Sequence, residues 1–349
     1  MNILSYTPDE LKELMLSLGE PKYRADQIFT QLHKGLSLDE MTNVGKSTRE
    51  KLSGAADCRL MSIRRKLCSA IDDTVKYLFE LSDGNCIESV VMKYEHGYTI
   101  CVSSQVGCRM GCRFCASTLA GRVRDLEAGE ILGQIISAQR DLGIRISNVV
   151  MMGIGEPLDN FDNVVKFLRL VNLPEGINIG YRHISLSTCG VVPGIYELAK
   201  LDLPITLSIS LHASDDATRN DIMPVNRAWS IDKLLDACRD YYKVTGRRMS
   251  FEYTLISGKN DTVQSALSLA ELLNSKLRSR KEGMPIHVNL IPVNEVTESG
   301  FKSSDRASVK RFAATLESKG IRATVRRTLG SDINASCGQL RREEAEANG

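Results

Sequence analysis

The 349-residue sequence lacks any apolar segment that could cross a membrane. No uncharged apolar run approaches the ~20 residues that a transmembrane helix needs. The N-terminal segment MNILSYTPDELKELM has no basic stretch followed by an apolar core, so a secretory signal is not expected. We therefore expect a cytoplasmic protein that makes no membrane contact.

A strong overall charge is also missing, because the net charge at pH 7 is only +2. The local distribution is more informative. The segment from Cys101 to Arg124 contains four arginines and no acidic residue, and the segment from Lys319 to Arg342 contains six basic residues against Asp332 alone. Such stretches ordinarily form a solvated surface. The alternative is a polyanionic partner.

Ten cysteines are present, and without an export signal they favour metal binding or catalysis over disulfides. Half of them lie in apolar or mixed surroundings, as small buried or neutral residues do. These are Cys58, Cys68, Cys86, Cys189 and Cys238. The remaining five need another explanation and are Cys101, Cys108, Cys112, Cys115 and Cys337.

The first 57 residues have helical patterns. In TPDELKELMLSLG, Thr7 is placed as an N-cap, Pro8 takes the first helical position and Glu10 completes a capping box. KYRADQIFTQLHKG and MTNVGKSTREKLSG predict two further helices. Small helical bundles of this kind often bind a nucleic acid backbone, although a purely structural bundle is the commoner outcome. Residues 58–95 instead predict paired strands, in KYLFELSDG and CIESVVMKY.

From residue 98 onward, short apolar strands alternate with helix-like stretches. The strands are expected in YTICVSS, SNVVMMG, RHISLST, PITLSISL, RMSFEYTL, PIHVNLI and IRATVRR, and helices at 128–142, 160–171, 231–244, 262–277 and 305–318. This alternation predicts βα units around a parallel sheet. Six or seven units are too few for an eight-fold barrel. We therefore expect an α/β protein with a partial, TIM-like (β/α)6 barrel and a small N-terminal helical domain.

The expected organisation has four parts. They are a helical, RNA-binding-like domain at 1–57, a β-rich linker region at 58–93, the barrel core at 94–332 and a C-terminal loop with a charged tail at 333–349. Chemistry in parallel α/β folds lies at the C-terminal ends of the strands. Several segments directly follow predicted strands, namely Cys108–Cys115, Gly153–Pro157, Ser187, Ser210–His212 and Asn294.

The motif C-x3-C-x2-C at Cys108, Cys112 and Cys115 has two metal interpretations. Structural zinc usually takes four ligands, often from two C-x2-C pairs, and no second pair is present. Three cysteines on one loop suit a [4Fe–4S] cluster that keeps one iron free of protein ligands. After the first strand of a partial barrel, the motif resembles the signature of the radical S-adenosylmethionine (SAM) superfamily. The resemblance implies that the free iron chelates the amino and carboxylate groups of SAM.

The segment MMGIGEP follows the second strand of the expected barrel. Gly153 and Gly155 would let the backbone approach a ligand closely. Glu156 can accept a hydrogen bond from the ammonium group of SAM. A glycine turn with a carboxylate is common by itself, so this motif gains its weight from the cysteines that precede it.

A series of specific motifs runs along nearly the whole chain, namely CIESV, CVSSQVGCRMGCRFCAST, VVMMGIGEPLDN, RHISLSTCGVVPGI, SISLHA, MPVNR, GRRMSFEYTL, HVNLIPVN and SDINASCGQL. Together they resemble the RlmN family of RNA adenine-C2 methyltransferases. The resemblance implies methylation of adenosine 2503 of 23S rRNA and adenosine 37 of tRNAs. It also implies SAM contacts at Glu156, Pro157, Ser187, Ser210, Leu211, His212 and Asn294. Cys189 in STCG is a departure, since relatives often carry a residue without a thiol there, and it is assigned no role.

The chemistry of adenine explains why this family uses two further cysteines. Carbon 2 lies between two ring nitrogens, is electron-poor and cannot attack a sulfonium methyl group. The resemblance implies that Cys337 takes a methyl group from one SAM, and that the deoxyadenosyl radical from a second SAM removes a hydrogen from it. The methylene radical then adds to carbon 2. Each turnover thus uses two SAM molecules, an electron donor and a thiol reductant.

Two further residues would complete that reaction. Glu88 in CIESV matches the residue that accepts the carbon-2 proton, and Cys101 matches the thiol that releases methylated RNA by forming a disulfide with Cys337. Without the family, Glu88 would be read as a surface residue, Cys101 as a buried strand residue and Cys337 as a loop residue. Two other functions fit part of the sequence, a Cfr-type carbon-8 methyltransferase and a non-catalytic Fe–S or zinc RNA-binding protein. A monomer is the default expectation.

Overall fold

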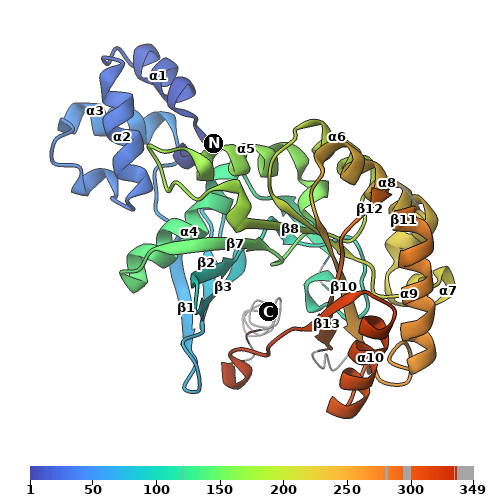
Figure 1. The fold of residues 1–349 in the computed structure, drawn as a ribbon. Helices are drawn as coiled ribbons and strands as arrows, with labels where there is room; N and C mark the ends of the chain where they lie inside the picture. Colours follow the sequence, from blue (N-terminus) through green and yellow to red (C-terminus); the bar gives the residue numbers. More distant parts are fainter. Residues whose placement is uncertain (120, 280–281, 294–299, 334, 336–349) are drawn as a thin grey trace.

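The computed structural model describes the chain except for residues 120, 280–281, 294–299, 334 and 336–349. Its centre is a ten-stranded sheet in the order β1-β2-β3-β4-β7-β8-β9-β10-β13-β14 (Figure 1). The strands are β1 (Ser62–Cys68), β2 (Val75–Glu80), β3 (Cys86–Tyr94), β4 (Gly97–Cys101), β7 (Ile146–Met151), β8 (Ile184–Thr188), β9 (Thr206–Ser210), β10 (Met249–Leu255), β13 (Ile286–Pro292) and β14 (Arg322–Val325).

The seven strands from β4 to β14 pair in parallel, and β1 to β3 extend the same sheet by antiparallel pairing onto β4. The α/β class and the partial barrel are therefore confirmed, with seven parallel strands in the run. The chain crosses from β3 to β4 within one continuous sheet. The paired strands that the sequence predicts before residue 95 are thus a direct extension of the barrel wall.

Helices cover the outer face of the parallel strands (Figure 1). They are α4 (Ala128–Leu142), α5 (Phe161–Asn172), α6 (Val192–Lys200), α8 (Ile231–Thr245), α9 (Val263–Leu277) and α10 (Arg306–Ser318), with the short α7 (Asp216–Ile222) after β9. All five barrel helices expected by range are present. The sequence analysis missed α6 and α7, because α6 begins with a turn-like Val-Pro-Gly and α7 has only seven, mostly polar residues. Within the described ranges, no helix is long and apolar enough to cross a bilayer.

The N-terminal residues form α1 (Pro8–Ser17), α2 (Tyr23–His33) and α3 (Lys46–Ala55), a separate group beside α4 and α5 (Figure 1). The predicted capping box is present, since the Thr7 hydroxyl accepts from the backbone N–H of Glu10 and the Glu10 carboxylate accepts from that of Thr7. The other Glu10 oxygen lies 2.8 Å from Lys166 Nζ on α5. The helix start thus also ties the bundle to the barrel.

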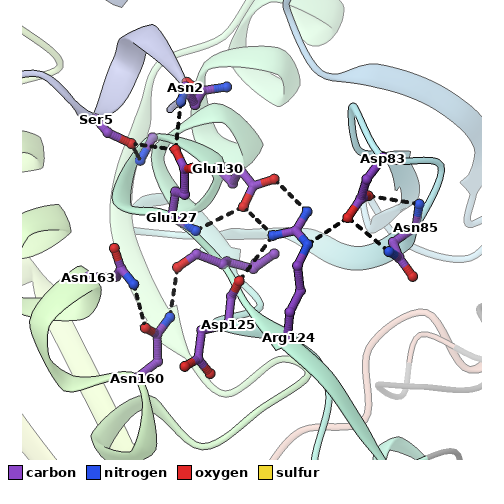
Figure 2. A network of polar contacts seen from close by, with 12 residues as sticks. Asn2, Ser5, Asp83, Asn85, Arg124, Asp125, Glu127, Glu130, Asn160 and Asn163 are labelled. Carbon is purple, nitrogen blue, oxygen red and sulfur yellow. Dashed lines mark hydrogen bonds and ion pairs between the residues drawn. The ribbon is translucent and has the colours of Figure 1, made fainter. Parts of the chain in front are cut away.

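A polar network joins the extreme N-terminus to the start of α4 (Figure 2). The backbone N–H of Asn2 donates to Glu127 Oε2 at 2.6 Å, and the N–H of Gly129 donates to Ser5 Oγ at 2.8 Å. A Cβ at Gly129 would lie 2.6 Å from both Asn2 Oδ1 and the backbone nitrogen of Ser5. The two segments therefore approach so closely that only glycine fits at this position.

The same network reaches the strand that follows the cysteine loop, β6 (Arg122–Asp125). The Arg124 guanidinium binds both carboxylate oxygens of Glu130 at 2.7 and 2.8 Å, and also Asp83 Oδ2 at 2.6 Å (Figure 2). The other three arginines of the basic stretch are also paired, Arg109 with Asp159, Arg113 with Asp221 and Arg122 with Asp125. Carboxylates from distant segments thus balance this stretch, and its charge by itself is no argument for a polyanionic partner.

Replacing Gly129 with alanine is expected to lower the free energy of unfolding by about 1–3 kcal/mol, because the added Cβ overlaps the N-terminal segment. Gly133→Ala, one turn later in α4, is the matched control. Its Cβ would meet Met61 Cε at 3.5 Å, an ordinary contact, so alanine there is expected to be neutral or slightly stabilising. Urea unfolding of both variants measures the difference. Equal stabilities would contradict the tight contact at Gly129.

Candidate active site

A cavity of about 520 Å³ opens at the C-terminal ends of the parallel strands. Ten predicted site residues line it, namely Glu88, Cys101, Cys108, Cys112, Cys115, Glu156, Pro157, Ser187, Ser210 and His212. Leu211 is fully buried between two lining residues and does not itself line the cavity. Asn294 and Cys337 lie outside the described residues. The fold thus brings residues from β3, β4, β7, β8 and β9 to one place.

The cysteine loop follows β5 (Gln105–Gly107), a short strand paired with β6. The hydroxyl of Thr118 donates to the carbonyl oxygens of Cys112 and Cys115, at 3.2 and 2.9 Å. These bonds fold the loop back on itself, and all three cysteines of the motif reach the cavity wall.

Burial makes these three thiols hard to ionise without a cation. It raises the pKa of Cys108 to about 12, that of Cys112 well above its ordinary value, and that of Cys115 as well. The proximity of the other thiols adds to the effect at Cys108 and Cys112. A bound metal centre supplies the missing positive charge and deprotonates coordinating thiols. The three cysteines therefore suit a metal centre, and without a metal their thiols stay protonated.

The arrangement favours a cluster over a single ion. A structural zinc ion usually takes four ligands, and this motif supplies three. In an iron–sulfur cluster each protein thiolate binds its own iron, so the ligands stay apart around the cluster. Three cysteines on one wall of a cavity satisfy that requirement.

Glu156 is buried at the end of β7, and its carboxylate is held by backbone groups. Its Oε2 accepts from the N–H of Cys189 at 2.7 Å and its Oε1 from the N–H of Leu158 at 3.0 Å. Burial raises the pKa of Glu156, while these N–H groups oppose the shift. Each carboxylate oxygen keeps a second lone pair, so Glu156 can also accept from a cationic ligand.

The glycines before Glu156 are required because the chain after β4 packs directly against them. A Cβ at Gly153 would lie 2.6 Å from the carbonyl oxygen of Val102, and one at Gly155 would lie 2.7 Å from the backbone nitrogen of Gln105. Gly155 also has a φ of 109°, which L side chains rarely adopt. The sequence predicted that these glycines let a ligand approach closely. The structure shows a close approach to the chain after β4, and both glycines also line the cavity.

His212, which the resemblance makes a SAM contact, lines the cavity and also forms a hydrogen bond within the protein. Its ring lines the cavity edge-on to Phe114, with ring centroids 4.9 Å apart. Its Nδ1 accepts from the backbone N–H of Thr254 at 2.9 Å. Burial lowers the pKa of His212 to about 3, so the ring is a neutral part of the wall. Its φ of 58° is rare for a residue with a side chain.

Arg219 on α7 is a residue that sequence reasoning missed. It is fully buried, and it donates to the carbonyl oxygens of Cys189, Ser210 and Leu211 at 2.7, 3.1 and 3.0 Å. It also donates to Asn226 Oδ1 at 2.8 Å. One guanidinium thus fixes the chain after β8 and after β9. A charged residue in a short polar helix gives no sign of this role in the sequence.

Glu88 lies on β3, and its carboxylate pairs with a second residue that sequence reasoning missed. Lys76 Nζ on β2 is 3.2 Å from Glu88 Oε2, and neither side chain is more than 1% exposed. Cys101 lies nearby at the end of β4. Burial raises the pKa of Cys101, the charges of Arg326 and Lys76 lower it, and that of Glu88 raises it. Glu88 is therefore buried, and the surface position that CIESV would suggest without the family is wrong.

Three charged residues that were not predicted as site residues line the cavity, namely Glu252, Arg326 and Arg327. Glu252 on β10 is buried, which raises its pKa, and it accepts from Asn289 Nδ2 at 2.7 Å. Glu252 is the one charged residue of the fully buried strand MSFEYTL, and a carboxylate in such a strand is a signal that could have found it. Arg326 and Arg327 lie at the exposed edge after β14, and neither forms an ion pair within the described part of the chain.

The segment that leads to the C-terminal loop is fastened to the turn between β1 and β2. The backbone N–H of Gly330 donates to Asp72 Oδ2 at 2.8 Å. Asp332 accepts from the hydroxyl of Ser69 and from the N–H of Ala70, both at 2.7 Å. Farther along, Ala335 packs on a small buried cluster formed by Val90, Met92 and Cys101.

Comparison with known proteins places the chain in a family. Residues 102–270 match the model of the radical SAM superfamily, and residues 1–58 match that of the ribosomal RNA large subunit methyltransferase N-terminal domain. A probable dual-specificity RNA methyltransferase RlmN of Clostridium acetobutylicum is 52% identical over 99% of this chain and 98% of its own length. That of Clostridium perfringens is 52% identical over 100% and 99%.

A solved structure agrees with these relatives. The crystal structure of a radical SAM methyltransferase from Sphaerobacter thermophilus superposes with a TM-score of 0.91 at 39% identity, covering 97% of this chain and 98% of that one. Sequence and fold therefore match over the full length, including the N-terminal helices and the strands that carry the cavity. The chain belongs to the RlmN family of the radical SAM superfamily.

Proposed function

We propose that the protein methylates carbon 2 of adenosine in RNA, at adenosine 2503 of 23S rRNA and adenosine 37 of tRNAs. Membership of the RlmN family supports an RNA methyltransferase, and relatives are named as dual-specificity enzymes. The observation that carries the proposal is the single cavity that gathers three cluster-type cysteines, a fourth cysteine outside their spacing and a buried carboxylate. A protein that only bound RNA would need neither Cys101 nor the buried carboxylate of Glu88 in this cavity.

In this proposal Cys108, Cys112 and Cys115 hold a [4Fe–4S] cluster. Glu156 receives the ammonium group of SAM, with Pro157, Ser187, Ser210, Leu211, His212 and Asn294 completing the SAM site. When bound, the cluster and SAM together supply an electron and a carbon radical that abstracts hydrogen from a methyl group. The backbone bonds to Glu156 support this assignment, because they orient the carboxylate before any ligand arrives.

Cys337 carries the methyl group in the proposed reaction. Its position is supported by the anchoring of the preceding segment, where Asp72 and Asp332 hold the chain and Ala335 packs beside Cys101. Cys337 follows Ala335 by two residues, and two residues of chain span at most about 7 Å. The placement of Ala335 beside Cys101 thus supports the proposal that the thiol at position 337 acts at this cavity.

Glu88 and Cys101 complete the reaction. Glu88 takes the proton from carbon 2 of the RNA-linked adenine, and its place inside the cavity supports that role. Cys101 then attacks the sulfur of Cys337, so that the sulfur–carbon bond breaks, a disulfide forms and the released carbon takes up a proton to become the methyl group. The unpaired electron left by the radical addition passes to a one-electron acceptor, for which the oxidised cluster would serve. Burial raises the pKa of Cys101, which keeps this thiol protonated until the charges around it change. A thiol reductant restores both cysteines.

RNA approaches over the exposed edge of the cavity. Arg326 and Arg327 support this direction, because they line the cavity and are not paired with carboxylates in the described residues. Unpaired arginines suit contacts with phosphate groups. The paired arginines near the cluster cysteines are less suited, since their charge is already balanced. The N-terminal helical domain is the second proposed RNA contact, in keeping with its family match.

Cys337→Ala is expected to abolish RNA methylation, because the variant has no sulfur to carry the methyl group. Its iron content is expected to stay at about four per chain, since the cluster ligands are unchanged. Methyl transfer from radiolabelled SAM and iron analysis after anaerobic purification measure both. Cys68→Ala, an exposed cysteine on β1, is the control and should retain full activity. Turnover by Cys337→Ala would rule out the methyl-carrying cysteine.

Cys101→Ala is expected to accumulate a covalent protein–RNA adduct, because the adduct forms but no thiol releases it. Denaturing gel electrophoresis with labelled RNA detects the adduct, and the Cys68→Ala control should show none at the end of the reaction. Normal product release without adduct would remove Cys101 from the mechanism.

The modified nucleoside is expected to be 2-methyladenosine. Digestion of treated rRNA and tRNA, followed by chromatography and mass spectrometry against both standards, separates it from 8-methyladenosine. Finding the 8-methyl isomer would replace the proposal with Cfr-type chemistry, and finding no methylated adenosine with intact cluster and SAM would leave an RNA-binding protein.

A further inference from the structure

Lys76 is a buried cation beside the active site that the proposed reaction leaves without a role. Its side chain is 1% exposed, and its Nζ lies 3.2 Å from Glu88 Oε2. Taking such a pair out of water costs several kcal/mol per ion, and apolar side chains of similar volume often give equal or greater stability. Stability of the fold is therefore a weak explanation for a lysine at this position.

The strand register places Lys76 on the cavity face. Lys76 on β2 pairs with Val90 on β3, and Val90 pairs with Cys101 on β4. Residues directly opposite in antiparallel strands point to the same face, and Glu88 shares that face because it is two residues from Val90. Lys76, Val90 and Cys101 therefore form a cross-strand row, with Glu88 diagonal to Lys76.

The row also sets the spacing of these groups. Neighbouring strands lie about 4.8 Å apart, so the backbones of Lys76 and Cys101 are separated by roughly 10 Å. Glu88 and Cys101 line the cavity, whereas Lys76 lies behind Glu88 and reaches it from β2. A group that contacts the carboxylate from behind can orient it without touching the RNA.

We propose that Lys76 is a positioning residue for the last steps of methylation, holding the Glu88 carboxylate toward the RNA-linked adenine and remaining as a cation beside Cys101 once Glu88 is protonated. The inference rests on the proposed function. In the step concerned, the proton of the carbon-2 C–H bond moves to Glu88, and the electron pair of that bond stays with the nucleotide. The ion pair, neutral beforehand, then has a net charge of +1.

That change of charge acts on the resolving thiol. Before the transfer, Glu88 raises the pKa of Cys101, while Lys76 and Arg326 lower it. Protonation of Glu88 removes a nearby charge that opposes ionisation and leaves the cations Lys76 and Arg326. The thiolate that attacks Cys337 is therefore favoured only after the carbon-2 proton has left. This order keeps Cys101 from attacking the RNA-linked sulfur of Cys337 before the carbon-2 proton has left.

The test is a single-turnover reaction on an RNA hairpin of 23S rRNA sequence, with hydrogen or deuterium at carbon 2 of the target adenosine. Wild type, Lys76→Met, Lys76→Gln and Lys76→Arg are compared with their clusters loaded. Three quantities are followed separately, the methylation of Cys337 by protein mass, the covalent adduct by denaturing gel and the release of methylated RNA. Lys66→Met on β1, whose lysine pairs with Asp141, is the matched control.

Lys76→Met and Lys76→Gln are expected to methylate Cys337 and form the adduct at wild-type rates. Their release of RNA is expected to slow by about 10- to 100-fold, which is part of the 10²–10⁴-fold rate enhancement that a positioned general base contributes. Deuterium at carbon 2 is expected to slow this release further, whereas it should not slow release by wild type. Lys76→Arg should stay within about tenfold of wild type, because the charge is kept. Lys66→Met should match wild type throughout.

Three results would overturn the inference. The first is release of RNA at the wild-type rate in both neutral variants, and the second is slower release without a deuterium effect. The third is loss of Cys337 methylation or of folding in both variants, which would mean that the Lys76–Glu88 pair is purely structural. Failure of the proposed function is distinguishable, because wild type itself would then form no methylated Cys337 or no 2-methyladenosine.

Discussion

The cavity wall depends on two buried charged side chains that hold one peptide segment from opposite sides. At Cys189, the backbone N–H donates to Glu156 and the carbonyl oxygen accepts from Arg219. Arg219 also binds the carbonyl oxygens of Ser210 and Leu211, so the ends of β7, β8 and β9 share one network. Buried polar groups rigidify a site when all are satisfied, and this network pre-forms the wall on which a ligand would bind. Cys189 thus contributes its backbone, whatever its side chain does.

Burial sets the chemical state of the whole site. It raises the pKa of the cluster cysteines, of Cys101 and of Glu156, and it lowers that of His212. Burial therefore shifts each group toward its neutral form, and a neighbouring charge of opposite sign reverses the shift. A metal centre would do so for the three cysteines, and the ammonium group of SAM for Glu156. Exclusion of water thus disfavours ionisation of the reactive groups, and a bound cation would favour it.

Much of the architecture could be predicted from local patterns. The seven parallel strands, five of their helices and the capping box at Thr7 follow from apolar periodicity and end signals that each lie within a few residues. The short helices α6 and α7 could not, because their length and composition resemble loops. The ion pairs of the basic stretch from Cys101 to Arg124 could not be predicted for a related reason, since carboxylates such as Asp159 and Asp221 come from distant segments.

The sequence by itself determined the chemistry available to this protein. The spacing of Cys108, Cys112 and Cys115 and the sulfur at positions 101 and 337 are properties of the chain that no fold could supply. Only the tertiary structure decided which groups act on one another. Lys76 meets Glu88, and Arg219 meets Cys189, because strand pairing and burial bring together side chains whose sequence neighbours show no sign of the contact. Hydrogen bonds and ion pairs depend on distance in space, and the sequence records only order along the chain.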